Sequence, residues 1–144
     1  MSNIYVGMDV HQSTITLAVL PAVAPAPSRA DQLPNDLPKL QRYLARVAAE
    51  GSIHACYEAS GAGYVLHRAL TSWGHGCAVI APSLIPTKPG VQRKYDRYDA
   101  IQLARLFRAG ELTAVRVPSE PEERVRDLVR CRATLQRELL QSKH

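Results

Sequence analysis

Apolar and polar residues alternate over the first ten positions, as they do in a β-strand with one buried face. Positions 4, 6, 8 and 10 are apolar and alternate with tyrosine, glycine, Asp9 and His11. Residues 14–20 are β-branched or apolar, and a short polar turn separates the two segments. The pattern predicts a β-hairpin whose first strand carries Asp9 inside it or at its end.

A proline- and alanine-rich segment at residues 21–28 follows the hairpin. We expect it to form a loose turn, because proline has no backbone N–H for a central strand. A short third strand is predicted over residues 29–33. A helix is predicted after it, with Asn35 or Asp36 as its N-cap and apolar residues at helical spacing up to residue 50.

The middle of the chain alternates strands and helices. Residues 52–57 form a predicted strand that ends at Glu58, residues 63–73 a helix capped by Ser60, and residues 77–81 another strand. Such lengths are typical of parallel β-α-β units. A hairpin and a third strand followed by β-α-β-α-β is the order of the ribonuclease H-like fold. The predicted class is therefore α/β, with a mixed sheet flanked by helices.

The last third of the chain predicts a helix from Asp96 to residue 109, a final strand over residues 112–117 and a long helix from residue 122 to at least residue 140. We expect residues 1–118 to form a catalytic domain and residues 119–144 to begin a helical arm that leads to a further domain. The arm has an approximate a/d stripe of apolar residues, which also favours a role in dimerisation.

Composition narrows the class of protein. The chain has 144 residues, of which 46% are hydrophobic and 22% charged, as in an ordinary soluble domain. It has no apolar run long enough for a membrane span and no signal peptide. Its three cysteines show no metal-ligand spacing, so we expect reduced, buried thiols in a cytoplasmic bacterial protein that associates with the nucleoid when it binds DNA.

The net charge of +5 is concentrated in the second half of the chain. Residues 1–72 hold five basic and five acidic residues, whereas residues 73–144 hold thirteen basic and eight acidic residues. A basic surface attracts phosphate backbones without regard to sequence. A solvated surface rich in arginine has the same composition, so the charge alone does not identify a nucleic-acid partner.

Four carboxylates are the candidate chemistry. Asp96 and Asp99 stand three residues apart at the start of a predicted helix, where they share one face, and helix capping is the simpler alternative. Asp9 in an apolar strand requires a partner to stay charged. In a ribonuclease H-like sheet, Glu58 ends the strand beside that of Asp9. Four converging carboxylates repel one another unless a cation such as Mg²⁺ (or Mn²⁺) joins them.

Such a site suits phosphoryl transfer. Two metal ions ~3.5–4 Å apart stabilise the attacking and leaving oxygens of an in-line displacement. We expect nearby basic side chains to hold the phosphodiester of a nucleic acid beside the carboxylates. The candidates for this role are Lys88, Arg93, Lys94 and Arg97.

Short blocks along nearly the whole chain resemble the N-terminal, RuvC-like domain of DEDD transposases of the insertion-sequence-110 type. The matching blocks are residues 7–11, 57–61, 81–86 and 94–100. The sequence differs from the usual family pattern at Gln12, Tyr95 and Tyr98.

The resemblance implies that four acids bind the metal and are catalytic, that the substrate is DNA in transposition and recombination, and that a guide RNA from the mobile element is a partner. These acids are Asp9, Glu58, Asp96 and Asp99. The resemblance also implies a C-terminal domain that carries a serine nucleophile. We assign that nucleophile role to no serine of this chain.

Three other functions share parts of the pattern. A nuclease that resolves Holliday junctions uses the same fold and the same kind of acids. A truncated, inactive module for nucleic-acid binding or dimerisation is the non-enzymatic alternative. Actin-like ATPases are disfavoured, because Val10, His11 and Gln12 stand where such enzymes need glycines to bind phosphate.

Overall fold

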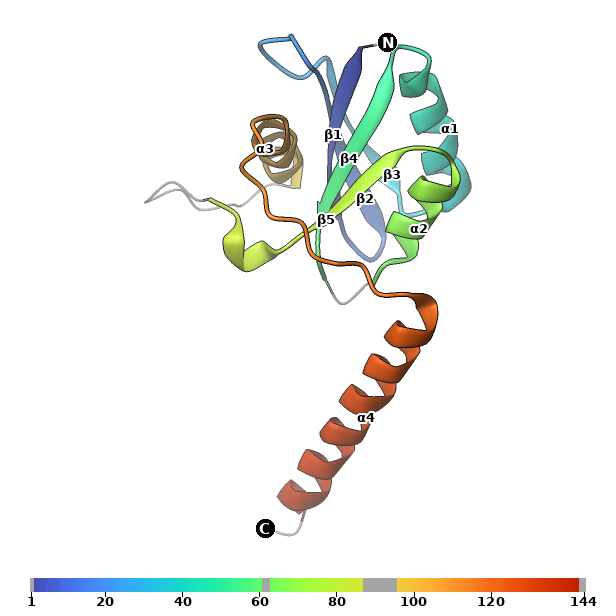
Figure 1. Cartoon of the computed structure of the whole chain (residues 1–144), viewed down its shortest axis with the longest axis vertical. Coiled ribbons are helices and arrows are strands. Elements are labelled where there is room, and N and C mark those ends of the chain that lie inside the picture. The colour runs from blue at the N-terminus through green and yellow to red at the C-terminus, as the bar shows by residue number, and fades with distance from the viewer. Residues whose placement is uncertain (1, 61–62, 87–95, 143–144) are drawn as a thin grey trace.

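The computed structural model describes residues 2–60, 63–86 and 96–142, with only the backbone described for residues 96–99 (Figure 1). Five strands form one sheet in the order β3-β2-β1-β4-β5. β1 pairs antiparallel with β2 and parallel with β4, which confirms the predicted hairpin and the mixed sheet. The strands are β1 (Asn3–Val10), β2 (Thr14–Pro21), β3 (Arg29–Pro34), β4 (Ser52–Glu58) and β5 (Gly76–Ile80).

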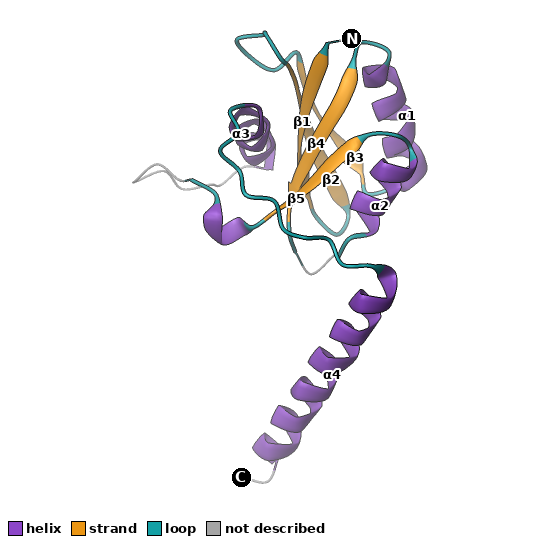
Figure 2. Ribbon diagram, viewed as in Figure 1, coloured by secondary structure: helices purple, strands orange, loops and turns teal. Residues whose placement is uncertain are grey.

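Helices cover both faces of the sheet, and one helix extends away from it (Figures 1 and 2). α1 (Leu37–Ala48) and α2 (Val65–Ser72) lie on one face, and α3 (Asp96–Arg108) lies on the other. α4 (Glu120–Ser142) projects from the end of the domain, and a short 3₁₀ turn (Pro82–Leu84) follows β5. The long C-terminal helix is therefore as predicted.

Alternation along the strands separates two cores. Val6 and Met8 of β1 pack with α1 and α2, whereas Ala18 of β2 packs with Ala100 and Ala104 of α3. Because successive residues of a strand face opposite sides, Gly7, between Val6 and Met8, faces α3. The single sheet is thus buried on both sides.

The ends of the first two helices test the predicted caps. Asp36 is the N-cap of α1, where its carboxylate accepts a hydrogen bond from the backbone N–H of Lys39 at 3.1 Å. The prediction for Ser60 is wrong, because α2 begins after Tyr64 and has no side-chain cap. The N-cap is Tyr64, with φ −117° and ψ 12°, four positions after Ser60.

The predicted last strand, residues 112–117, is also wrong as a strand. The segment makes one isolated antiparallel bridge, between Ala114 and Ile80 of β5. Leu112 packs in the core under α3, whereas Val115 packs in the core under α1 and α2. Residues three apart in an extended segment point to opposite faces, so the segment runs beside β5 as an extended stretch that pairs with it only around this bridge, through Thr113 and Val115.

The cysteines differ from the expectation of three buried thiols. All three are free, but only Cys56 is buried; Cys77 is half-buried and Cys131 is exposed on α4. Burial raises the pKa of the Cys56 thiol well above its ordinary value and raises the pKa of Cys77 to about 12. The exposure of Cys131 follows from the projection of α4 away from the domain.

Candidate metal and nucleic-acid site

Asp9 and Glu58 lie at the carboxyl ends of two neighbouring parallel strands. Asp9 is the penultimate residue of β1, and Glu58 is the last residue of β4. Met8 pairs with Tyr57, and each acid is the next residue of its strand. Asp9 and Glu58 therefore lie at the same level of the sheet. Adjacent strands are ~4.8 Å apart, which places the two carboxyl-bearing backbones side by side.

Both acids lie on the face of the sheet that α3 covers. A Cβ on Gly7, two residues before Asp9, would lie 2.1 Å from the carbonyl oxygen of Ala100 in α3. Cys56, two residues before Glu58, donates from its Sγ to the carbonyl oxygen of Leu103 at 3.8 Å. Residues two apart in a strand share a face. Asp9 and Glu58 therefore stand on the α3 side.

The direction of α3 brings its first turn to the same end of the sheet. At its last residue, the Arg108 guanidinium donates to the carbonyl oxygens of Pro21 and Ala24, at 3.1 and 2.6 Å. Pro21 pairs with Ile4 at the start of β1. α3 therefore runs antiparallel to β1, and its first residues lie toward the end of β1 that carries Asp9.

Asp96 and Asp99 belong to that first turn of α3. Asp96 opens the helix, and Asp99 directly precedes the buried Ala100 that contacts Gly7. The backbone thus directs the four predicted acids to one end of one face. The side chains of Asp96 and Asp99 lie outside the described part, so their shared role with Asp9 and Glu58 stays a prediction. Among the described side chains, no three acidic, histidine or cysteine groups form a metal-binding cluster.

His11 contacts Asp9, which the sequence did not predict. Its Nε2 lies 3.1 Å from the Oδ2 of Asp9, and the two side chains are 46% and 18% exposed. The spacing of two along an extended backbone was the available signal, because it places both side chains on one face.

Thr16 is a second residue beside Asp9 that sequence reasoning missed. It is the antiparallel partner of Asp9 in β2 and is 3% exposed. Its Oγ1 has no hydrogen-bond partner among the described residues. Only the register of β1 and β2 reveals this pairing, because Thr16 stands seven positions after Asp9, in the next strand. The oxygen-only donors Asp9, Glu58 and Thr16 match the ligands that hard divalent cations prefer.

Three of the four predicted phosphate-binding residues lie outside the part of the chain that the structure describes. Lys88, Arg93 and Lys94 lie outside the described residues, and only the backbone of Arg97 is described, in the first turn of α3. Their role in nucleic-acid binding stays a prediction.

The start of α4 is held against the domain by Arg68 of α2. The Arg68 guanidinium lies 2.6 Å from the Glu123 carboxylate and donates to the carbonyl oxygen of Pro118 at 3.1 Å. Arg116 also forms two hydrogen bonds to Glu122, at 2.8 and 3.0 Å. These contacts place the first turns of α4 beside the segment that follows Glu58.

A family model described as a transposase, of the DEDD insertion-sequence-110 type, matches residues 6–144. The chain belongs to this family of DEDD transposases. The resemblance of the four sequence blocks is thereby confirmed. In the part of the chain that the structure describes, no helix combines the length and the apolar character that a membrane span requires.

Two relatives of this DEDD transposase chain carry transposase names. It is 37% identical over 139 residues to the "Transposase for insertion sequence element IS1533" of Leptospira borgpetersenii, covering 95% of this chain and 40% of that protein. It is 53% identical over 96 residues to the "Putative transposase y4qE" of Sinorhizobium fredii (strain NBRC 101917 / NGR234), covering 66% of this chain and 25% of that protein. The chain therefore spans less than half the length of these relatives.

A solved structure shows the same fold. RuvC of T. thermophilus, in complex with a Holliday junction substrate, matches with a TM-score of 0.53 and 10% identity. The match covers 78% of this chain and 99% of the RuvC chain. The transposase chain thus has a RuvC-like fold, which confirms the predicted ribonuclease H-like class.

Proposed function

We propose that this chain is the metal-binding catalytic domain of a DNA transposase that cleaves and transfers DNA strands. The observation that carries the proposal is the meeting of Asp9 and Glu58 on adjacent strand ends, on the face that the first turn of α3 approaches. Family membership supplies the transposition reaction. The RuvC likeness supports the fold on which such carboxylates are arranged.

The donor set fits a divalent cation. Asp9 and Glu58 provide carboxylate oxygens, and the buried Thr16 hydroxyl lies at the same level of the sheet. Asp96 and Asp99 would complete the set. Bound Mg²⁺ or Mn²⁺ would neutralise these acids and stabilise charge on the oxygens of the scissile phosphodiester.

The residues of the chain have distinct roles in this proposal. The carboxylates of Asp9, Glu58, Asp96 and Asp99 hold the cation at the sheet end. His11 contacts Asp9 at 3.1 Å and orients its carboxylate. Lys88, Arg93, Lys94 and Arg97 would hold the phosphate backbone at the anionic cluster.

Metal binding tests the proposal directly. Calorimetry with Mn²⁺ and with Mg²⁺ should show binding to the wild-type chain, and Asp9→Asn and Asp99→Asn should each weaken it by about tenfold or more, since an amide replaces a charged ligand. Glu111→Gln, on an exposed loop after α3, is the matched control and should bind as the wild type does. A wild-type chain that binds neither ion would contradict the proposal.

We further propose that α4 pairs with α4 of a second copy. Large apolar side chains lie exposed along it, including Leu128 at 71% and Leu139 at 61%. Their spacing approximates an a/d seam, which is buried only when another helix covers it. Analytical ultracentrifugation should show a dimer that L128E with L135E dissociates. Thr134→Glu, on the opposite side of the helix, should leave the dimer intact.

A guide RNA is the remaining partner in the proposal. This part of the proposal rests on family membership alone. Transposition by the whole protein would also use a serine-bearing domain beyond the catalytic acids. The chain spans 40% of the Leptospira borgpetersenii transposase, so it would supply the carboxylate half of that reaction.

A further inference from the structure

A polar pocket lies between the segment after Glu58 and the first turns of α4. Its volume is about 450 Å³. Ala59 forms part of its wall and is the residue after Glu58, so the pocket lies next to the candidate metal site. The lining residues are Ala59, Ser60, Gly63, Tyr64, Glu123, Arg126, Asp127 and Arg130.

The charges in the pocket favour an anion. Glu123 is already engaged by Arg68 at 2.6 Å, so its charge is compensated within the domain. Arg126 and Arg130 then oppose the single remaining acid, Asp127. An excess of arginine in a polar pocket suits a phosphate group, which arginine binds through two parallel hydrogen bonds.

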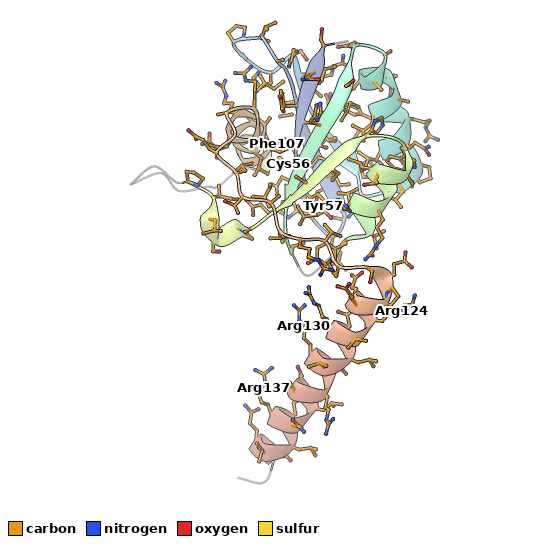
Figure 3. All side chains as sticks on the ribbon, viewed as in Figure 1. Cys56, Tyr57, Phe107, Arg124, Arg130 and Arg137 are labelled. Atoms are coloured by element: carbon orange, nitrogen blue, oxygen red, sulfur yellow. The ribbon has the colours of Figure 1, made fainter. Side chains whose placement is uncertain are left out.

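The arginines of the pocket continue along α4. Arg126, Arg130 and Arg137 follow one another at spacings of four and seven residues, which keeps them on one side of a helix. Figure 3 shows Arg130 and Arg137 projecting from the same side of α4, and Arg124 from the opposite side. We call Arg126, Arg130 and Arg137 the arginine row.

The arginine row is separate from the other surfaces of α4. Within the described residues, no acid lies within ion-pair distance of its three members, whereas Arg124 lies 3.8 Å from Glu120. The nearby charge of Arg126 contributes to lowering the pKa of Glu122, after the hydrogen bond from Arg116. The helical spacing also sets the row well away from the exposed apolar stripe of Leu128 and Leu135. A dimer formed through the apolar stripe would therefore leave the arginine row accessible.

We propose that the arginine row, together with the pocket at the Arg126 end of the row, binds the phosphate backbone of a DNA strand. The strand would then run to the end of the sheet where Glu58 lies. The inference rests on the proposed function, since it gives the DNA substrate of that site its path. Arg126 and Arg137 are about 16 Å apart along the helix axis, at 1.5 Å per residue. One strand of B-form DNA carries a phosphate every 3.4 Å of axis, so the row spans about five phosphates.

Salt-dependent DNA binding tests the path. The triple variant R126Q/R130Q/R137Q and a control triple R42Q/R124Q/R132Q lose the same charge, but only the first loses the row. Fluorescence anisotropy with labelled single-stranded DNA, duplex DNA and RNA of the same sequence, in EDTA, would follow the dissociation constant from low to physiological salt. Circular dichroism would confirm that both variants keep the fold.

The row variant should bind single-stranded DNA about tenfold or more weakly, and the slope of log K against log salt should fall by about 2, because each phosphate contact contributes ~0.7. The control triple should change the slope by less than half of that. Equal losses in the two variants would show a general effect of charge and overturn the proposal. So would a loss confined to RNA of the same sequence.

A single substitution tests the pocket without removing any arginine. Asp127→Asn removes the one acid of the lining that Arg68 does not engage and should tighten DNA binding by about threefold, by removing repulsion from phosphate. Unchanged or weaker binding would contradict a phosphate in the pocket. Mn²⁺ calorimetry separates this inference from the metal site: all these variants should bind Mn²⁺ as the wild type does. A wild-type chain that binds DNA through the row but binds no metal would refute the proposed function alone.

Discussion

Gly7→Ala tests whether close packing of α3 on β1 builds the site. The new Cβ would lie 2.1 Å from the carbonyl oxygen of Ala100, 2.6 Å from the backbone nitrogen of Ala104 and 3.1 Å from the Cβ of Leu103. The first two contacts are with helix backbone, which cannot rotate away as a side chain can. α3 must therefore move from the sheet by about 1 Å.

The expected loss in the free energy of unfolding is at the upper end of the range for overpacked cores. Inserted methyl groups in well-packed cores destabilise by about 1–3 kcal/mol, and the double backbone clash at Gly7 favours about 3 kcal/mol. For a domain of this size, that lowers the melting temperature by roughly 6–12 °C. The displaced helix also carries Asp96 and Asp99, so Mn²⁺ affinity should fall in the same variant.

Thermal melting by circular dichroism and Mn²⁺ calorimetry would measure the two effects. Gly76→Ala is the matched control, since its Cβ would meet its nearest neighbours, in His54 and Ile53, at 3.4 Å, an ordinary contact. It should melt at or above the temperature of the wild type, because alanine loses less backbone entropy on folding than glycine. If Gly7→Ala melts within about 2 °C of the wild type, the close contact of α3 with β1 is refuted.

Three further predictions concern α4 and the thiols. Arg68→Ala should release the first turn of α4 by leaving Glu123 without its guanidinium, and hydrogen exchange should rise at residues 118–124 but not in the exposed control Arg124→Ala. Cys131 should react with a thiol reagent as fast as free cysteine, while Cys77 reacts more slowly; equal rates would refute the burial of Cys77. Burial raises the pKa of Cys77 from 9.0 to about 12. Because the pKa of Cys77 is higher in the folded state than in the unfolded state, the unfolded state loses its proton first as the pH rises. Urea denaturation should therefore show full stability below about pH 9 and a loss of stability between pH 9 and 12. A free energy of unfolding that stays constant over that window would contradict this.

Hydrophobic alternation and cap chemistry were sufficient to predict most elements of the fold. The β1–β2 hairpin follows from the alternation around Gly7 and Asp9, since a period of two is that of an extended strand. Asp36 was predictable as a cap because its carboxylate can bind an N–H that no helical carbonyl reaches. The positions of Asp9 and Glu58 at strand ends were predictable because each follows an apolar run, while their role in a site stays a prediction.

The failures came where tertiary contacts decide. Ser60 has the chemistry of a cap, but the N-cap of α2 is Tyr64, four positions later, where no side chain caps the helix. Residues 112–117 have strand-forming side chains, but their backbone pairs with β5 only around the bridge between Ala114 and Ile80. How far such a segment pairs with its neighbour depends on the packed chain and not on local preference.

By itself, the sequence determined the identity of the candidate acids, the order of the strands and helices and the transposase family. These depend on residue type and spacing, which are local. The tertiary structure decided that Thr16 and His11 stand beside Asp9, that α3 runs antiparallel to β1, and that Arg68 joins α4 to the domain. Each of those depends on strand register, helix direction or a contact between distant residues, and only the packed chain brings such groups together.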